Sequence, residues 1–152
     1  PDAARAALAA MRFPGRFELV AGDPPIVLDG AHNPQAAAVL AEAIGEAWPD
    51  PERRPVCVLG VLADKDAEGI VRALAPVVSG FVCTQPPSPR ARAACALAAV
   101  VERVAGAPTG IEPDLMAALD AASAATACGV VVTGSLYAVG GMRTSLMRRI
   151  SL

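Results

Sequence analysis

Short apolar runs alternate along the chain with longer stretches in which apolar residues recur at helical spacing. The run "VCVLGVL", from Val56 to Leu62, is almost continuously apolar and rich in valine, which is typical of a strand covered on both faces. "GFVCT" (80–84) and "GVVVTG" (129–134) have the same character, and a weaker strand is expected at 109–112. These runs predict the interior strands of a sheet.

The stretches between these runs predict helices. After Asn33 and Pro34, the side chains of Leu40, Ile44 and Trp48 lie four residues apart, so they share one helical face. Asn33 is expected to cap this helix, with Pro34 as its first residue. The expected helical ranges are 3–11, 34–47, 66–75, 89–104 and 113–126, with a last helix that runs to residue 149.

The segment "RFELVAGDPPIVLDG", from Arg16 to Gly30, predicts two short strands around a turn at 22–25. Their separation favours an antiparallel hairpin. Strands that then alternate with helices predict an α/β fold, in which a mostly parallel sheet is covered on both faces and the hairpin adds an antiparallel edge strand. Residues 1–152 contain no repeat or internal linker, so we expect a single domain.

Composition narrows the class of protein. Hydrophobic residues make up 54% of the 152 residues but aromatic residues only 3%, which predicts a core of small side chains. A net charge of -2 offers no basic surface for nucleic acid, and the apolar runs are too short to span a membrane. The four cysteines form no C-x-x-C pair, which favours a reduced, cytoplasmic protein over a disulfide framework. Because Pro1 stands where a methionine would begin a chain, we expect a piece of a longer protein.

Polar or glycine-bearing stretches follow the predicted strands directly: "DGAHNP", "GVLADKD", "TQPPSPR" and "TGSLY". In open α/β sheets, ligands bind beyond the carboxyl ends of the strands. Asp29 stands at such an end, where a carboxylate can accept hydrogen bonds from the hydroxyls of a ribose. His32, the only histidine, can donate to an anion or exchange a proton near neutral pH. The alternative for His32 is an exposed loop residue without a ligand.

Each of the other candidate residues also has a structural alternative. Asp64 and Asp66 suit a helix N-terminus, and Lys65 either contacts a ligand or only solvates its loop. Ser88-Pro89 is expected to start a helix, and Arg90 faces either an anion or water.

Ser135 and Arg16 complete the candidate set. The Ser135 hydroxyl and nearby backbone N–H groups either cap a helix or hold a carboxylate, and Arg16 is otherwise a surface residue of the hairpin. Neither G-x-x-x-x-G-K-[ST] nor G-x-G-x-x-G occurs anywhere in the chain, so it lacks the phosphate loop of an ATPase.

Taken together, five stretches occur in the order of a known family: "FPGRFE", "VLDGAHNPQA", "VLGVLADKD", "SPRA" and "TGSLYAVGGMR". The chain resembles the C-terminal domain of folylpolyglutamate synthase and dihydrofolate synthase, in the Mur ligase superfamily. The resemblance covers nearly all of the chain and implies a Rossmann-like three-layer sandwich. Muropeptide ligases share a related A-H-N-P element with a different lead-in, so the folate branch is preferred.

The resemblance implies an amide ligase in which this domain closes over an N-terminal ATPase domain absent from this chain. That partner domain is expected to carry the phosphate loop, the Mg²⁺ ligands and most folate contacts. ATP would phosphorylate a carboxylate of the dihydropteroate or folate substrate, and the amino group of L-glutamate would then attack the acyl phosphate. The products would be an amide, ADP and phosphate, and this domain alone would be inactive.

Residue roles also follow from the resemblance. It implies that Arg16 and Asp29 bind ATP, and that His32 and Ser135 lie near the incoming glutamate, with His32 as the candidate catalytic residue. Lys65 and Arg90 (positions in matching motifs) are possible further contacts. The alternatives are the C-terminal domain of another Mur-type ligase, a non-catalytic nucleotide-binding module, and a structural or oligomerising domain.

Overall fold

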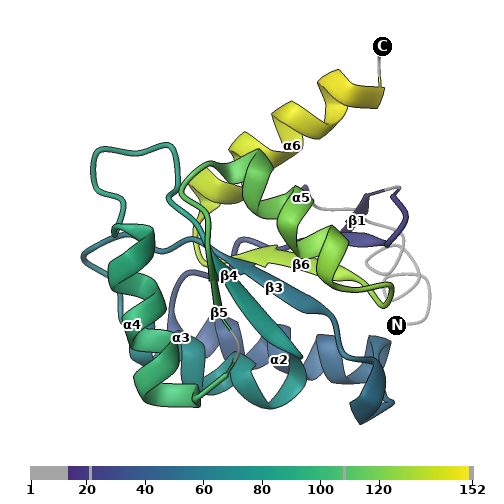
Figure 1. Ribbon diagram of the computed structural model, residues 1–152, viewed down its shortest axis with the longest axis horizontal. Coiled ribbons are helices and arrows are strands. Elements are labelled where there is room, and N and C mark those ends of the chain that lie inside the picture. The colour runs from purple at the N-terminus through teal and green to yellow at the C-terminus, as the bar shows by residue number, and fades with distance from the viewer. Residues whose placement is uncertain (1–13, 21, 108, 151–152) are drawn as a thin grey trace, which may run out of the picture.

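The computed structural model describes residues 14–20, 22–107 and 109–150. Within them lies a six-stranded sheet of order β1-β2-β6-β3-β4-β5 (Figure 1). Its strands are β1 (Glu18–Val20), β2 (Ile26–Leu28), β3 (Val56–Leu59), β4 (Gly80–Cys83), β5 (Thr109–Ile111) and β6 (Val130–Thr133). The helices are α2 (Pro34–Ala47), α3 (Ala67–Leu74), α4 (Ala94–Ala105), α5 (Leu115–Ala125) and α6 (Leu136–Ile150), with short 3-10 helices η1 (Pro51–Arg53) and η2 (Ala75–Val77). The helix expected at 3–11 lies outside the described residues.

The pairing of the strands confirms the expected fold class. β1 runs antiparallel to β2, whereas the β2–β6, β6–β3, β3–β4 and β4–β5 pairs are parallel. Helices α2, α3 and α4 cover one face of the sheet, and α5 and α6 cover the other (Figure 1). The fold is therefore a Rossmann-like three-layer sandwich with an antiparallel edge strand.

Alternate residues of each interior strand pack into opposite layers. On β3, Cys57 and Leu59 join the cluster formed with α2, α3 and α4, whereas Val56 and Val58 join the cluster formed with α5 and α6. Both faces of the strand are thus buried, which explains its nearly continuous apolar sequence. Phe81 is the largest of the fully buried side chains, so small aliphatic groups fill most of the core, as the composition predicts.

Strand β3 ends earlier than expected, at Leu59 and not at Leu62. The chain leaves the sheet after Gly60, whose N–H donates to the carbonyl of Thr133 at 3.0 Å. The next residue, Val61, accepts from the N–H of Arg92 at 2.9 Å. The apolar residues after Leu59 therefore remain buried but pair with a loop. An apolar run in the sequence does not distinguish such a buried segment from a strand.

Helix α4 begins at Ala94, and the expectation that Ser88-Pro89 starts it is wrong. Ser88 Oγ accepts from the N–H of Arg90 at 3.2 Å within a turn, so this hydroxyl closes a loop and caps no helix. The N-cap of α4 is Ala93, which makes no side-chain cap bond. Two other expected caps are confirmed: Asn33 Oδ1 accepts from Ala36 N–H and Asp66 Oδ1 from Gly69 N–H.

All four cysteines lie within the described residues and are free; Cys57 and Cys83 are buried in the sheet, where a thiol acts as a small apolar group. Among the described helices, none combines the length and apolar character needed to cross a membrane.

Candidate functional site

All candidate residues from the sequence lie at one edge of the sheet, where the parallel strands end. The loop after β2 is joined to the loop after β6, because Gly134 N–H donates to Ala31 O at 2.9 Å. The loop after β3 is joined to β6 by the bond from Gly60 N–H to Thr133 O at 3.0 Å. The turn before β1 reaches the same edge, since Gly30 N–H donates to Gly15 O at 2.7 Å. Three loops and one turn therefore meet here.

A cleft of about 510 Å³ opens at this edge beside α2. Three candidate residues, Arg16, Asp29 and His32, line it together. Its remaining walls are largely apolar, and Val39 and Leu136 are unusually exposed for aliphatic side chains, at 66% and 63%. An apolar wall with a few polar groups at its rim is the usual character of a small-molecule site.

Asp29 holds the turn that carries Arg16. Its Oδ2 accepts from Phe17 N–H at 2.9 Å and its Oδ1 accepts from Ala31 N–H at 2.8 Å. Phe17 has φ +42° and Gly15 has φ +73°, so this turn adopts a backbone that costs free energy for the non-glycine residue. Each carboxylate oxygen keeps a second lone pair for a ligand hydroxyl.

The hydrogen bond of His32 fixes the roles of its two ring nitrogens. Nδ1 lies 2.8 Å from the carbonyl oxygen of Gly30, and a carbonyl can only accept. Nδ1 therefore carries a proton and donates it, so Nε2 holds the lone pair of the neutral ring. The ring is half-buried and lines the cleft, which leaves Nε2 as its chemically useful atom.

Ser135 lies at the same edge but is buried, with 1% of its surface exposed. It immediately precedes α6, and its Oγ accepts from Tyr137 N–H at 3.1 Å, so the expected capping role is confirmed. Gly134 before it has φ +99°, and a Cβ there would lie 2.7 Å from Gly60 O. The hydroxyl still has a proton to donate, in addition to its capping bond.

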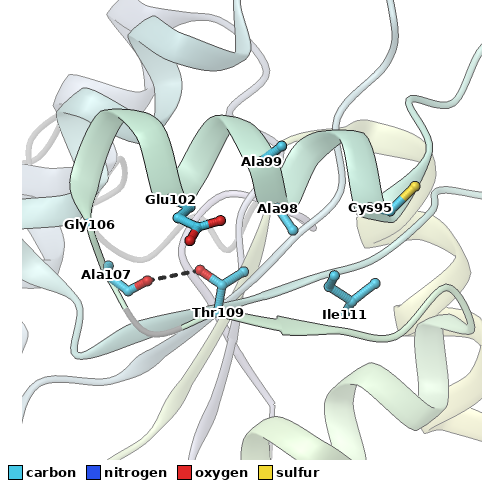
Figure 2. Close-up of a pocket in the computed structure, with 8 residues that line it drawn as sticks. All are labelled: Cys95, Ala98, Ala99, Glu102, Gly106, Ala107, Thr109 and Ile111. Carbon is cyan, nitrogen blue, oxygen red and sulfur yellow. Dashed lines mark hydrogen bonds between the residues drawn. The ribbon is translucent and has the colours of Figure 1, made fainter.

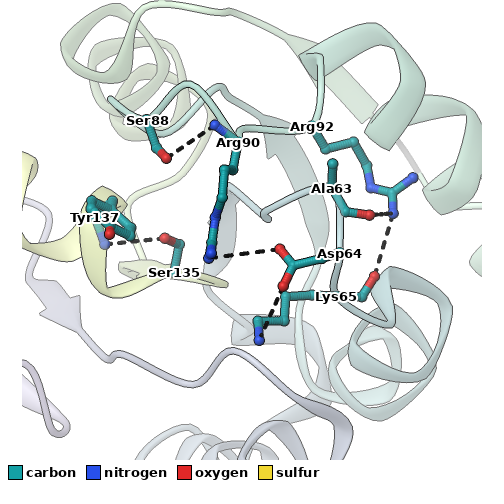
Figure 3. A network of polar contacts seen from close by, with 8 residues as sticks. All are labelled: Ala63, Asp64, Lys65, Ser88, Arg90, Arg92, Ser135 and Tyr137. Carbon is teal, nitrogen blue, oxygen red and sulfur yellow. Dashed lines mark hydrogen bonds and ion pairs between the residues drawn. The ribbon is translucent and has the colours of Figure 1, made fainter.

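Asp64, Lys65 and Arg90 form a second polar group at this edge (Figure 3). The Asp64 carboxylate lies 3.5 Å from Lys65 Nζ and 3.8 Å from Arg90 Nη2. Asp64 therefore forms ion pairs, and the expectation that it caps a helix is wrong. Desolvation raises its pKa, but its backbone hydrogen bond and the charges of Arg90 and Lys65 outweigh that effect and leave the pKa below its usual value. Two cations thus converge on one carboxylate.

Sequence reasoning missed two residues that shape this edge. Arg92 Nη2 donates to the carbonyls of Ala63 and Lys65, at 3.0 and 3.3 Å. Glu18 accepts from Gly15 N–H at 2.8 Å and from Arg143 Nε at 3.1 Å. No local sequence pattern indicates these roles, because the carbonyls bound by Arg92 and the guanidinium that binds Glu18 belong to distant segments of the chain.

A second cavity, of about 560 Å³, lies between α4 and β5 (Figure 2). Its lining is mostly alanine, glycine and the aliphatic Ile111, and Thr109 Oγ1 there donates to Ala107 O at 2.9 Å. Glu102 is the charged residue of its wall. None of the candidate residues lines it, and it offers few groups for chemistry, so the cleft beside α2 is the stronger candidate site.

No metal centre belongs to this edge in the described part of the chain. There, no three or more histidine, cysteine, aspartate or glutamate side chains gather so as to hold a metal ion.

The model of one protein family, described as Mur ligase, glutamate ligase domain, matches residues 15–136. The chain belongs to this family. Gly15 and Leu136, the two ends of the match, both line the cleft beside α2. The match covers most of the chain, and the resemblance found in the sequence is confirmed.

Relatives of known sequence narrow the branch of the family. Dihydrofolate synthase/folylpolyglutamate synthase of Mycobacterium tuberculosis is 37% identical over 159 residues, which cover 94% of this chain and 32% of the relative. Folylpolyglutamate synthase of Lacticaseibacillus casei is 31% identical, covering 97% of this chain and 33% of the relative. The glutamate ligase domain described here therefore spans about one third of the length of these relatives.

Solved structures agree with this assignment. Mycobacterium tuberculosis folylpolyglutamate synthase, complexed with ADP and AMPPCP, matches with a TM-score of 0.86 and 37% identity, over 95% of this chain and 35% of that chain. E. coli FolC in complex with DHPP and ADP matches with a TM-score of 0.83 and 31% identity, over 97% of this chain and 34% of that chain. The matching third of each of these solved chains has the fold found here.

Proposed function

We propose that this chain is the C-terminal part of an ATP-dependent ligase that adds L-glutamate to dihydropteroate or folate. The observation that carries the proposal is the meeting of Arg16, Asp29 and His32 in one cleft, in a chain of the glutamate ligase domain family. Relatives with this function support the choice of substrates. In this proposal the reaction proceeds through an acyl phosphate.

The cleft beside α2 is the proposed ATP side of the site. Val39 and Leu136 offer exposed apolar surface for a flat ring, and the Asp29 oxygens have lone pairs for ribose hydroxyls. Arg16 is exposed on the same wall, where its guanidinium can pair with a phosphate. Because Asp29 Oδ2 also accepts from Phe17 N–H in the Arg16 turn, one carboxylate would orient both the nucleotide hydroxyls and the phosphate-binding residue.

His32 and Ser135 are the proposed glutamate side. Transfer of the γ-phosphoryl group to the substrate carboxylate gives an acyl phosphate and ADP. The glutamate amine then attacks the acyl carbon, the C–O bond to phosphate breaks, and the nitrogen loses a proton. His32 Nε2, with its lone pair directed away from the Gly30 contact, is the group proposed to accept that proton. The Ser135 hydroxyl is proposed to donate to a glutamate carboxylate.

The remaining parts of the machinery are proposed to lie in the rest of the full-length protein. The chain contains no phosphate loop of its own, and the described residues gather no metal site. We therefore assign Mg²⁺ binding, the phosphate loop and most folate contacts to an ATPase domain opposite this edge. Closure of two domains over an acyl phosphate would exclude water and position the amine.

The proposal is tested by phosphate release from the full-length protein. Release is expected only when ATP, L-glutamate and a dihydropteroate or folate substrate are all present. Absence of release with all three overturns the assignment. Calorimetry of the chain with ATP tests the rival hypothesis of a nucleotide-binding module. Micromolar binding without the rest of the protein favours the module. Weak or no binding favours a chain that supplies only part of the ATP site.

A further inference from the structure

Arg92, in the loop between β4 and α4, has no role in the function proposed above, yet it contacts the segment that carries Lys65. Its Nη2 donates to Ala63 O at 3.0 Å and to Lys65 O at 3.3 Å (Figure 3). Its Nε is buried and has no hydrogen-bond partner among the described residues. One guanidinium nitrogen therefore joins two carbonyls that flank Asp64.

The two loops at this position also pair through their backbones. Ala63 N–H donates to Arg90 O at 2.8 Å, Arg92 N–H donates to Val61 O at 2.9 Å, and an antiparallel bridge joins Leu62 to Ala91. This short pairing ends where residues 64–66 turn toward α3. The Arg92 guanidinium binds carbonyls beyond this bridge. It therefore extends the contact between the two loops to the backbone of Lys65.

The ion pairs of Asp64 are too weak to hold this segment by themselves. The carboxylate lies 3.5 Å from Lys65 Nζ and 3.8 Å from Arg90 Nη2, and the Asp64 and Arg90 side chains are more than half exposed. Exposed pairs of this kind contribute little stability. Hydrogen bonds from a charged donor to backbone carbonyls are stronger. Arg92 is therefore the side chain that contributes most to holding the loop after β3 in place.

We propose that Arg92 is a positioning residue that holds Lys65 and Arg90 as a pair of cations for a carboxylate of the incoming amino acid. Both cations already converge on one carboxylate, that of Asp64, so their spacing suits a carboxylate ligand. Arg92 does not touch the ligand; it fixes the backbone from which Lys65 projects. This proposal rests on the proposed function. It adds a residue that determines how well the amine-bearing substrate, L-glutamate, binds.

Kinetics of the full-length protein test the proposal. R92Q should raise the KM for L-glutamate about tenfold, while the KM for ATP stays within about twofold. R92K keeps the charge and places its N–H donors on a single nitrogen, so it should restore part of the loss. R72Q is the matched control, because Arg72 is an exposed arginine of α3 whose ion pair, with Glu68 at 4.0 Å, lies away from this loop. An unchanged KM for L-glutamate in R92Q, or equal losses for ATP and glutamate, overturns the proposal.

Hydrogen exchange gives a readout that does not need activity. The amides of Ala63 and Lys65 donate to Arg90 O and Leu62 O, so R92Q should speed their exchange in the full-length protein, and R72Q should not. Unchanged exchange in R92Q overturns the role of Arg92 in holding the loop. If the wild-type protein shows no glutamate-dependent turnover, the proposed function fails, and the exchange result still decides the structural role separately.

Discussion

Glu18 and Arg143, which are 125 positions apart, join the last helix of the chain to the turn that carries Arg16. Arg143 Nε donates to one carboxylate oxygen of Glu18 at 3.1 Å, and the other oxygen accepts from Gly15 N–H at 2.8 Å. The Glu18 side chain is only 19% exposed, so water competes weakly for these bonds. A residue of α6 thereby helps to shape the wall of the cleft on which Arg16 lies.

Replacement of Glu18 should therefore act on ATP use. E18A removes both bonds and frees the turn, so we expect the KM for ATP of the full-length protein to rise about three- to tenfold. E18Q keeps a carbonyl oxygen for Gly15 N–H but loses the charge opposite Arg143, and we expect a smaller rise. Steady-state kinetics with E42Q, an exposed change on α2, as control would check this. A normal KM for ATP in E18A would contradict it.

Asp29 allows a prediction that separates stability from binding. D29N keeps one acceptor but turns an NH₂ group toward a backbone N–H of Phe17 or Ala31. One donor then loses its partner, which should lower the free energy of unfolding by about 1–3 kcal/mol. Chemical denaturation of the full-length protein would measure this cost.

The same substitution should raise the KM for ATP, because the Arg16 turn and the proposed ribose acceptor both depend on this carboxylate. The KM for L-glutamate should change less. If D29N lost stability while its KM for ATP stayed at the wild-type value, Asp29 would be a structural residue only.

The fold could be predicted from the sequence because the signals for its strands and helix starts lie in short, local stretches of the chain. Valine-rich runs such as 130–133 predict interior strands, and Asn33 and Asp66 predict helix starts that the structure confirms. The errors came where local signals were ambiguous. The Ser88-Pro89 pair closes a turn, and the apolar residues after Leu59 are buried without belonging to the strand.

The site could be predicted only in part, because some of its contacts join segments that are far apart in the sequence. Residue types at strand ends identified Asp29 and His32, which the fold brings into one cleft. The supporting contacts of Arg92 and Glu18 could not be predicted, because each depends on a partner from a distant segment. The burial of Ser135 beneath α6 likewise follows from packing that no motif encodes.

Gly134 is the position at which backbone geometry most restricts the edge. Its φ is +99°, and an added Cβ would lie 2.7 Å from Gly60 O and 2.9 Å from Leu59 Cδ1. G134A should therefore lower the free energy of unfolding by at least about 2 kcal/mol. G140A on α6 is the control, since a Cβ there meets nothing within 4 Å and alanine favours a helix by up to about 1 kcal/mol. Equal stability of the two variants would contradict the expected strain.

The buried thiols should respond to pH through folding. Burial raises the pKa of Cys83 to about 12, and burial and the neighbouring Cys83 raise the pKa of Cys57 still further. Because the unfolded chain loses these protons near pH 9 and the folded one does not, the stabilising contribution is complete below that pH and is lost as the pH rises. Unfolding free energies measured between pH 7 and 10.5 should therefore decline above about pH 9.

Alkylation gives an independent check on the same thiols. At pH 8, iodoacetamide should label the exposed Cys95 in the native protein and reach Cys57 and Cys83 only after denaturation. Mass spectrometry of peptides resolves the sites. Rapid native labelling of Cys57 or Cys83 would contradict their burial in the sheet.

His32 offers the sharpest test of the proposed chemistry, because its two nitrogens have different tasks. In H32N, the side-chain amide places a donor near the position of Nδ1 and can keep the bond to Gly30 O, but nothing replaces Nε2. We expect kcat to fall by about 100-fold or more if Nε2 accepts the amine proton, with the unfolding free energy nearly unchanged. H32Q places its amide nearer the position of Nε2 and should lose the Gly30 bond instead. Wild-type kcat in H32N would restrict His32 to shaping its loop.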